Sequence, residues 1–269
     1  MTLDETVYSS KDNRYAIGAF QWIQFQLDNY STIEEVMTSD TLLRIVDATS
    51  KIHFLVSDRF GHVVAIEFLN GKMVCHTGKS LPVEALANST YEKSVSCYNN
   101  NGDIQSDRSL YNYCTAGHQI QQNNSSSGDS AIINAFHTLS AVSQGLGTKW
   151  SIVYDVTNMR IYFKIFETPV IVGEQKIFLK QPGEVVMKYV DLNDFDFNCH
   201  NAPKVLDLDF NHAGVVNKYF VEYSTGINKE FIAKTFTFFK GWGINVDLKD
   251  EELDYLAKYP ESFRCIGGK

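Results

Sequence analysis

Asn88 is the first residue whose chemistry needs an explanation. It lies in the segment LANSTYEK, residues 86–93, directly after a stretch typical of strands. Its side-chain amide suits a turn or a helix N-cap, and it equally suits a donor aimed at a substrate carbonyl. Because Asn88-Ser89-Thr90 matches the N-x-S/T pattern, a glycosylation acceptor is a third interpretation. The residues around Asn88 leave all three open.

No other motif supplies a ready catalytic site. The sequence lacks G-x-S-x-G, H-E-x-x-H, P-loop and G-x-G-x-x-G patterns, which carry nucleophile, zinc and phosphate chemistry. None of the seven histidines pairs with another at i, i+4 on a predicted helix, so we predict no metal or triad role for them. An acidic cluster alternates with Leu and Phe, which fits solvated strand faces better than an acid/base pair. The cluster comprises Asp191, Asp194, Asp196, Asp207 and Asp209.

The five cysteines are spread along the chain, with no CxxC pair and no Cys/His cluster at zinc-ligand spacing; they are Cys75, Cys97, Cys114, Cys199 and Cys265. We therefore predict no metal and no cofactor, and we expect most of these side chains to be small buried hydrophobes. Cys75 falls within a predicted strand, where it has no α-amino group to act as a base. A nucleophile at Cys97 or Cys114 is a separate hypothesis.

Composition indicates a folded protein that does not bind nucleic acid. Of the 269 residues, 44% are hydrophobic and 21% are charged, and the formal net charge is -8. Phosphate binding needs clustered Lys and Arg, whereas the 24 basic residues here are scattered. The sequence has neither a membrane-length apolar run nor the basic and apolar regions of a signal peptide. We expect a soluble protein, periplasmic or cytoplasmic, that forms a single domain over residues 1–269.

Two helices are predicted before the first sheet. Residues 12–30 predict a helix that begins after Asp12 or Asn13. Its apolar positions recur at helical spacing, and we expect them to form the buried face: Ala16, Phe20, Ile23 and Leu27. Ser31 or Thr32 is the predicted cap of a second helix, whose first turn is acidic.

An antiparallel meander is predicted next. The runs rich in Val, Ile and Phe are residues 42–46, 51–58, 62–69 and 72–77. The turn DRFG, residues 58–61, joins the second run to the third, and Asn70-Gly71 joins the third to the fourth. These strands bring the chain to Asn88.

The sequence after the meander predicts helices and one more hairpin. Helices are predicted over residues 106–120 and 129–142, followed by a hairpin over residues 150–165 that turns at Thr157-Asn158. Three further helices are predicted to end near Tyr223, near Gly241 and just before Pro260. Antiparallel strands with helices between them predict an α+β fold, with helical layers packed on sheets.

These segments, in this order, resemble the choloylglycine hydrolases and penicillin V acylases, which are linear amide hydrolases. The resemblance is carried by KIHFLVSDRFGHVVAIEFLNGKMVCHTGKSLPVEALANSTYEKSV (residues 51–95), by QWIQFQLDNYSTIEEV before it and by TKWSIVYDVTNMRIYFKIF after it. It runs from roughly residue 10 to residue 210 and implies the αββα sandwich of N-terminal nucleophile hydrolases. There an N-terminal cysteine supplies both the thiolate and the α-amino base. The substrate it implies is a small linear amide, of the N-acyl amide, bile-salt or penicillin V type.

The resemblance also assigns two site residues. The family's asparagine after the meander matches Asn88, which would then be an oxyanion donor or a substrate anchor. The family's arginine at a helix start matches Arg108 in QSDRSLYNY, where it would support the nucleophile site electrostatically. Ala87 and Ser109 depart from the residues usual beside these two positions. The short spacing between Asn88 and Arg108 leaves no room for a long assembly hairpin.

The family's N-terminal elements have no counterpart in residues 1–269: the nucleophilic Cys, an Arg and an Asp after it, and an N-E-x-G-L element. We therefore expect the cysteine nucleophile to be absent from this chain and the chain alone to be inactive. One hypothesis is the C-terminal portion of an amide hydrolase, whose partner is the missing N-terminal segment or a second copy in a homo-oligomer. The alternative is a non-catalytic remnant or binding module that takes an amide ligand without turnover.

Overall fold

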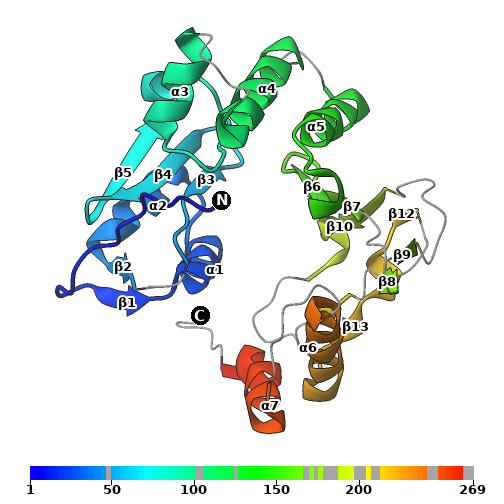
Figure 1. The fold of residues 1–269 in the computed structure, drawn as a ribbon. Helices are drawn as coiled ribbons and strands as arrows, with labels where there is room; N and C mark the ends of the chain where they lie inside the picture. Colours follow the sequence, from blue (N-terminus) through cyan, green and yellow to red (C-terminus); the bar gives the residue numbers. More distant parts are fainter. Residues whose placement is uncertain are drawn as a thin grey trace. The chain divides into compact units, whose positions relative to one another are not determined.

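The computed structural model describes residues 1–46, 50–100, 106–123, 127–148, 150–165, 170–172, 175–177, 187–196, 204–206, 213–240 and 248–262. Two compact units divide the chain, Met1–Ser143 and Gln144–Lys269, and each is described by itself (Figure 1). The prediction of one domain over residues 1–269 stays a prediction. Within the described ranges, none of the helices combines the length and the apolar character needed to cross a bilayer.

The first unit is built on a three-stranded antiparallel sheet in the order β3-β4-β5. The strands are β3 (Phe54–Ser57), β4 (Val63–Leu69) and β5 (Lys72–Thr77). Both predicted hairpins are confirmed, with Phe54 opposite Ile66 and Ile66 opposite Cys75. Asn70 and Gly71 have φ angles of 54° and 79°, the left-handed pair that a two-residue hairpin turn requires.

One face of this sheet packs against α1 (Ala19–Asn29) and α2 (Ile33–Thr38). Trp22 of α1 stacks on Phe54 with ring centroids 4.5 Å apart. The predicted helix is present, but it begins at Ala19, because residues Tyr15–Ile17 form β1, which pairs in parallel with β2 (Leu43–Ile45). The second helix is capped as predicted, since Thr32 and Glu35 form a capping box.

The predicted buried face of the first helix is wrong. Phe20 and Leu27 are 63% and 75% exposed, whereas Trp22 is 2% exposed. The helix carries a second stripe at helical spacing, consisting of Ala19, Trp22 and Gln26, and this stripe faces the sheet. Periodicity alone could not choose between the two stripes; the large ring of Trp22 finds aromatic partners on β3 and β4.

The opposite face of the sheet carries the segment 81–90 and two helices, α3 (Tyr91–Asn100) and α4 (Arg108–Asn123). Successive residues of β4 point to opposite faces, so Ala65 joins this second cluster while Val64 and Ile66 belong to the first. The α3 helix was missed because its sequence, YEKSVSCYNN, is polar. The α5 helix (Asp129–Ala141) is confirmed and packs against α4.

The N-terminal residues add to the edge of this sheet. Thr2 forms an antiparallel bridge with Ile52, and Leu3, which is completely buried, donates its amide to the Lys51 carbonyl at 3.0 Å. The Met1 amino group donates to the His53 carbonyl at 3.1 Å, and His53 N–H donates back to the Met1 carbonyl at 2.9 Å. Residues 1–3 are therefore anchored beside the start of β3.

The second unit contains a four-stranded sheet in the order β12-β10-β7-β6. These strands are β6 (Trp150–Asp155), β7 (Arg160–Ile165), β10 (Lys188–Asp191) and β12 (Gly214–Val215). The β6–β7 hairpin is confirmed, with Tyr154 opposite Ile161. Two smaller pairs join β8 (Val170–Val172) to β9 (Gln175–Ile177) and β11 (Lys204–Val205) to β13 (Val221–Glu222).

The last two predicted helices are present, as α6 (Thr225–Lys240) and α7 (Asp250–Lys258). The helix predicted to end near Tyr223 is wrong, because β12, a short 3-10 turn at Asn217–Tyr219 and β13 occupy that stretch. Val216 explains the difference: it is completely buried beside Phe163 and Val190 of the sheet. Burial against strands outweighs the local helical pattern here.

Candidate functional site

Asn88 lies between the sheet and α3, with an exposed side chain. It is not the residue that caps the helix: Thr90 directly precedes α3, and its hydroxyl accepts the Lys93 amide at 3.4 Å. The Asn88 side-chain N–H instead donates to the hydroxyl oxygen of Thr2. The amide therefore faces the N-terminal strand segment and is accessible to solvent, as a ligand-facing donor would be.

Arg108 is the first residue of α4. Its guanidinium donates to the Ser143 carbonyl at 2.9 Å and lies 5.5 Å from the ring centroid of Tyr111. A cation at a helix N-terminus is unfavourable for the helix dipole, so its position is not explained by helix stability. Asp107, just before it, supplies the favourable charge and accepts the Ser109 amide at 3.0 Å.

A hydrogen bond joins the two segments that carry these candidates. Ser89 donates its hydroxyl to the Ser109 hydroxyl at 2.9 Å. Ser89 follows Asn88 and Ser109 follows Arg108, so the segment after the meander and the start of α4 lie side by side. The structure thus brings together the neighbourhoods of both residues that the sequence singled out.

Beneath Asn88 lies a buried polar cluster that sequence reasoning missed. Glu67 on β4 and His53 before β3 are both completely buried. Glu67 Oε1 accepts from His53 Nδ1 at 3.4 Å and from the Tyr91 amide at 2.8 Å, while His53 Nε2 bonds to the Ala87 carbonyl at 2.6 Å. The signal in the sequence was a glutamate inside the apolar run HVVAIEFL, because an acid buried in a strand must be paired.

No protein-family model matches the chain, and no curated protein matches it. Solved structures do match. Penicillin V acylase from Agrobacterium tumefaciens superposes with a TM-score of 0.65 at 21% identity, covering 82% of this chain and 72% of that one. Two variants of conjugated bile acid hydrolase from Clostridium perfringens superpose with a TM-score of 0.56 each, at 16% and 15% identity, covering 73% and 79% of this chain and 70% and 73% of theirs.

The chain has the fold of penicillin V acylase. We call it the acylase fold. The predicted α+β class, with antiparallel sheets and helical layers as in N-terminal nucleophile hydrolases, is confirmed, and so is the resemblance to choloylglycine hydrolases and penicillin V acylases at the level of the fold. The match extends beyond the first unit, because that unit holds 143 of the 269 residues and the match covers 82% of the chain.

Within this acylase fold, Cys75 and Cys114 are poor nucleophiles. Cys114 on α4 is buried, and burial, together with the neighbouring Cys97, raises the pKa of its thiol to about 11. Cys75 lies on β5 as predicted, where burial and then the charge of Asp40 raise its pKa to about 11. A thiol with such a pKa is almost entirely protonated at neutral pH, which argues against the hypothesis of a nucleophile at Cys114.

The structure also bears on the acid/base pair considered for the acidic cluster around Asp191. Asp191 accepts a hydrogen bond from Arg160 Nε at 2.9 Å, and this bond is the main reason that the pKa of Asp191 lies below its ordinary value. Its other oxygen accepts the Asn193 amide. Asp191 therefore pairs with a cation rather than with a second acid, while Asp207 and Asp209 lie outside the described residues.

One group of metal-ligand type occurs in the described part of the chain. Ligand atoms of Glu34, Asp58 and His62 lie within 4.8 Å of one another. The Asp58 oxygens already accept the Phe60 amide at 2.8 Å, the His62 amide at 3.1 Å and His62 Nδ1 at 3.0 Å. Although burial raises the pKa of Asp58, these hydrogen bonds bring it below its ordinary value. We interpret these contacts as hydrogen bonding within the DRFG turn, and we propose no metal site there.

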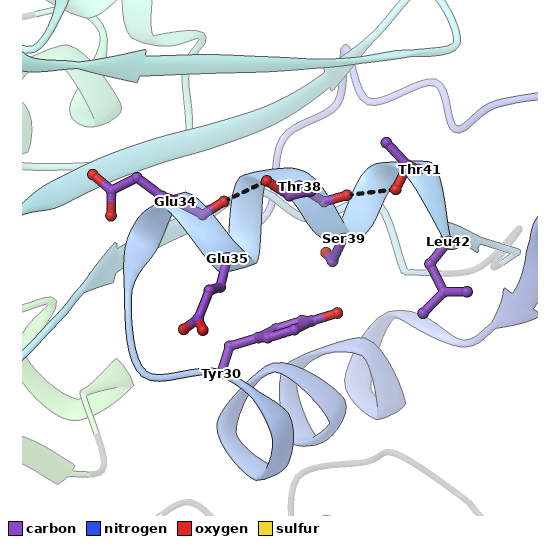
Figure 2. Close-up of a pocket in the computed structure, with 7 residues that line it drawn as sticks. All are labelled: Tyr30, Glu34, Glu35, Thr38, Ser39, Thr41 and Leu42. Atoms are coloured by element: carbon purple, nitrogen blue, oxygen red, sulfur yellow. Dashed lines mark hydrogen bonds between the residues drawn. The ribbon is translucent and has the colours of Figure 1, made fainter.

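A shallow hollow of about 380 Å³ lies along α2 and is lined by Tyr30, Glu34, Glu35, Thr38, Ser39, Thr41 and Leu42. Figure 2 shows the ring of Tyr30 lying alongside the helix, with Glu35 above it. The Glu35 carboxylate is occupied by the Ser31 and Thr32 amides, which lower its pKa. Neither Asn88 nor Arg108 lines this hollow, and its residues offer no nucleophile or base arrangement.

Proposed function

We propose that this protein recognises a small linear amide and hydrolyses its carbon–nitrogen bond, with Asn88 as a donor to the substrate carbonyl and Arg108 as the neighbouring cation. Two observations support the proposal: the acylase fold and the exposed amide of Asn88. The structural neighbours are named for penicillin V and conjugated bile acids. The substrate class proposed here is correspondingly an acyl amide of the N-acyl amino acid, bile-salt or penicillin V type.

The direction of the Asn88 amide carries the proposal. Amide hydrolysis passes through a tetrahedral intermediate whose oxygen becomes negative, and a fixed N–H donor lowers the free energy of that state. Asn88 Nδ2 is held by a hydroxyl that a substrate oxygen could replace. Arg108 adds positive charge, and within the described part of the chain its guanidinium donates to the Ser143 carbonyl alone, so further N–H groups can reach a ligand.

In this proposal, Asn88 and Arg108 recognise the amide and stabilise the transition state. No residue from Met1 to Lys269 is proposed as the nucleophile. A non-catalytic module that binds an amide ligand is the alternative outcome. The two differ in one measurement, because only a hydrolase releases an amine.

The test measures binding and turnover of penicillin V by the purified protein. We expect saturable binding in calorimetry, and a fluorescence assay for primary amines then distinguishes a hydrolase, which releases the amine product, from a binding module. Replacing Asn88 with Ala removes one hydrogen bond to the ligand and should weaken binding about two- to tenfold. Any turnover should fall about 100-fold or more, the usual effect of losing an oxyanion donor.

Asn100→Ala is the matched control, since Asn100 is an exposed asparagine of the same unit that, among the described residues, hydrogen-bonds to Ser96 of α3 alone. It should leave binding and turnover unchanged. Binding without amine release would favour the binding-module alternative. No binding of penicillin V or of N-acyl amino acids would refute the proposed function.

A further inference from the structure

Glu67 is a buried carboxylate with an unusual set of donors. It lies on the central strand of the three-stranded sheet, faces α3 and is completely buried. Oε1 receives His53 Nδ1 at 3.4 Å and the Tyr91 amide at 2.8 Å, and Oε2 faces His76 Nε2 at 3.3 Å. Burying a carboxylate is costly unless donors and a positive charge compensate it. This cluster meets that requirement with imidazole nitrogens and the first amide of a helix.

Both ring nitrogens of His53 face an oxygen atom in this arrangement. Its Nε2 faces the Ala87 carbonyl at 2.6 Å, which can only accept, and its Nδ1 faces the Glu67 carboxylate. Burial by itself raises the pKa of Glu67, but the hydrogen bonds from His53 and Tyr91 and the charges of His53 and His76 bring it below its ordinary value. A lowered pKa favours the carboxylate form of Glu67, which can accept from His53 and from the Tyr91 amide.

His53 and Glu67 hydrogen-bond to the chain on both sides of Asn88. The Ala87 carbonyl belongs to the peptide bond that leads into Asn88, so His53 fixes the chain immediately before it. Glu67 fixes the chain three residues later, at the Tyr91 amide. The His53 backbone also pairs with Met1 in both directions, which sets the strand segment that presents Thr2. One buried residue therefore holds both partners of the Asn88–Thr2 contact.

We propose that His53 and Glu67 are positioning residues, which hold the Asn88 amide in the orientation that receives the ligand carbonyl. This inference rests on the proposed function for its ligand, but the orientation of Asn88 can be measured without one. Charge is essential to the arrangement. A neutral imidazole has a single N–H, so without the Glu67 charge either the Ala87 carbonyl or the oxygen at position 67 loses its hydrogen bond from His53.

The decisive variant is Glu67→Gln, which keeps the shape of the side chain and removes its charge. The Asn88 side-chain amide signals, assigned by their loss in Asn88→Ala, are followed in 15N-edited NMR spectra of the full chain. We expect them to shift towards the values of a free asparagine in Glu67→Gln and in His53→Gln. In calorimetry, penicillin V should bind about two- to tenfold more weakly to both variants.

His76→Gln is the matched control, because His76 shares the Glu67 carboxylate, whereas the Ala87 carbonyl is bonded by His53. It removes a comparable contact and should leave the Asn88 signals in place. This separates positioning from a general loss of stability, which thermal unfolding reports for all three variants. Unchanged Asn88 signals in folded Glu67→Gln would overturn the inference.

The wild-type protein provides a test that needs no folded variant. The 15N spectra of the His53 ring should show a proton on Nε2, which faces the Ala87 carbonyl, and an unprotonated Nε2 would contradict the proposed pair. If the wild type binds no penicillin V while its Asn88 and His53 signals behave as expected, the proposed function fails and the positioning role stands. If the wild type binds penicillin V but the Asn88 signals are unchanged in Glu67→Gln, the positioning role alone fails.

Discussion

Single residues decide what this chain can do chemically, and its thiols show this most directly. Burial raises the pKa of Cys75 and of Cys114 to about 11. At pH 7 only about one such thiol in ten thousand is ionised, so both should react slowly with iodoacetamide. The rate should rise as the pH approaches 11, because only the thiolate attacks. Mass spectrometry of the labelled peptides measures both sites separately.

The control is the same reaction in denaturant, where both thiols become exposed and should label rapidly. Fast labelling of native Cys114 at neutral pH would restore the hypothesis of a nucleophile at this position. If the native protein hydrolyses an amide, alkylation limited to the accessible thiols should leave that activity unchanged.

Elements position these residues, and the first helix offers a clear contrast between two faces. Trp22 is 2% exposed and stacks on Phe54, whereas Leu27 is 75% exposed. Trp22→Ala should lower the free energy of unfolding by about 3 to 5 kcal/mol, through lost burial and the cavity left behind. Leu27→Ala should change it by no more than about 0.5 kcal/mol. Urea unfolding of the two variants makes the comparison, and similar losses in both would contradict the orientation of α1.

The same contrast explains what the sequence could and could not reveal about elements. Hairpins were predictable because local residues determine them, as Asn70-Gly71 does with its positive φ angles. The buried face of α1 was not, because two stripes at helical spacing compete and only the sheet selects the one with Trp22. The chain around Val216 reads as a helix but is taken up by short strands that bury this residue.

The candidate site was likewise only partly predictable from the sequence. Asn88 and Arg108 were found through their place in an ordered set of motifs. The setting of Asn88 was not, because Thr2 contacts it, and His53 and Ser109 contact its neighbours, from segments far apart in the sequence. A lone glutamate in an apolar strand is a local signal, but its donors become known only when the chain is folded.

At the scale of the whole molecule, the two compact units should unfold together. The match to the acylase fold covers 82% of the chain and so includes residues of both units, and a single domain was expected from the absence of a linker. In native-state hydrogen exchange, the slowest amides of β4 and of β7 should therefore report the same free energy of opening. Both values should fall in parallel as urea is added, with the slope of global unfolding.

Amides at the ends of α6 and α7 are the internal control, since fraying should open them at lower free energy and with little dependence on urea. A lower opening free energy for β7 than for β4 would show that Gln144–Lys269 unfolds independently, and that the single domain must be divided near Ser143.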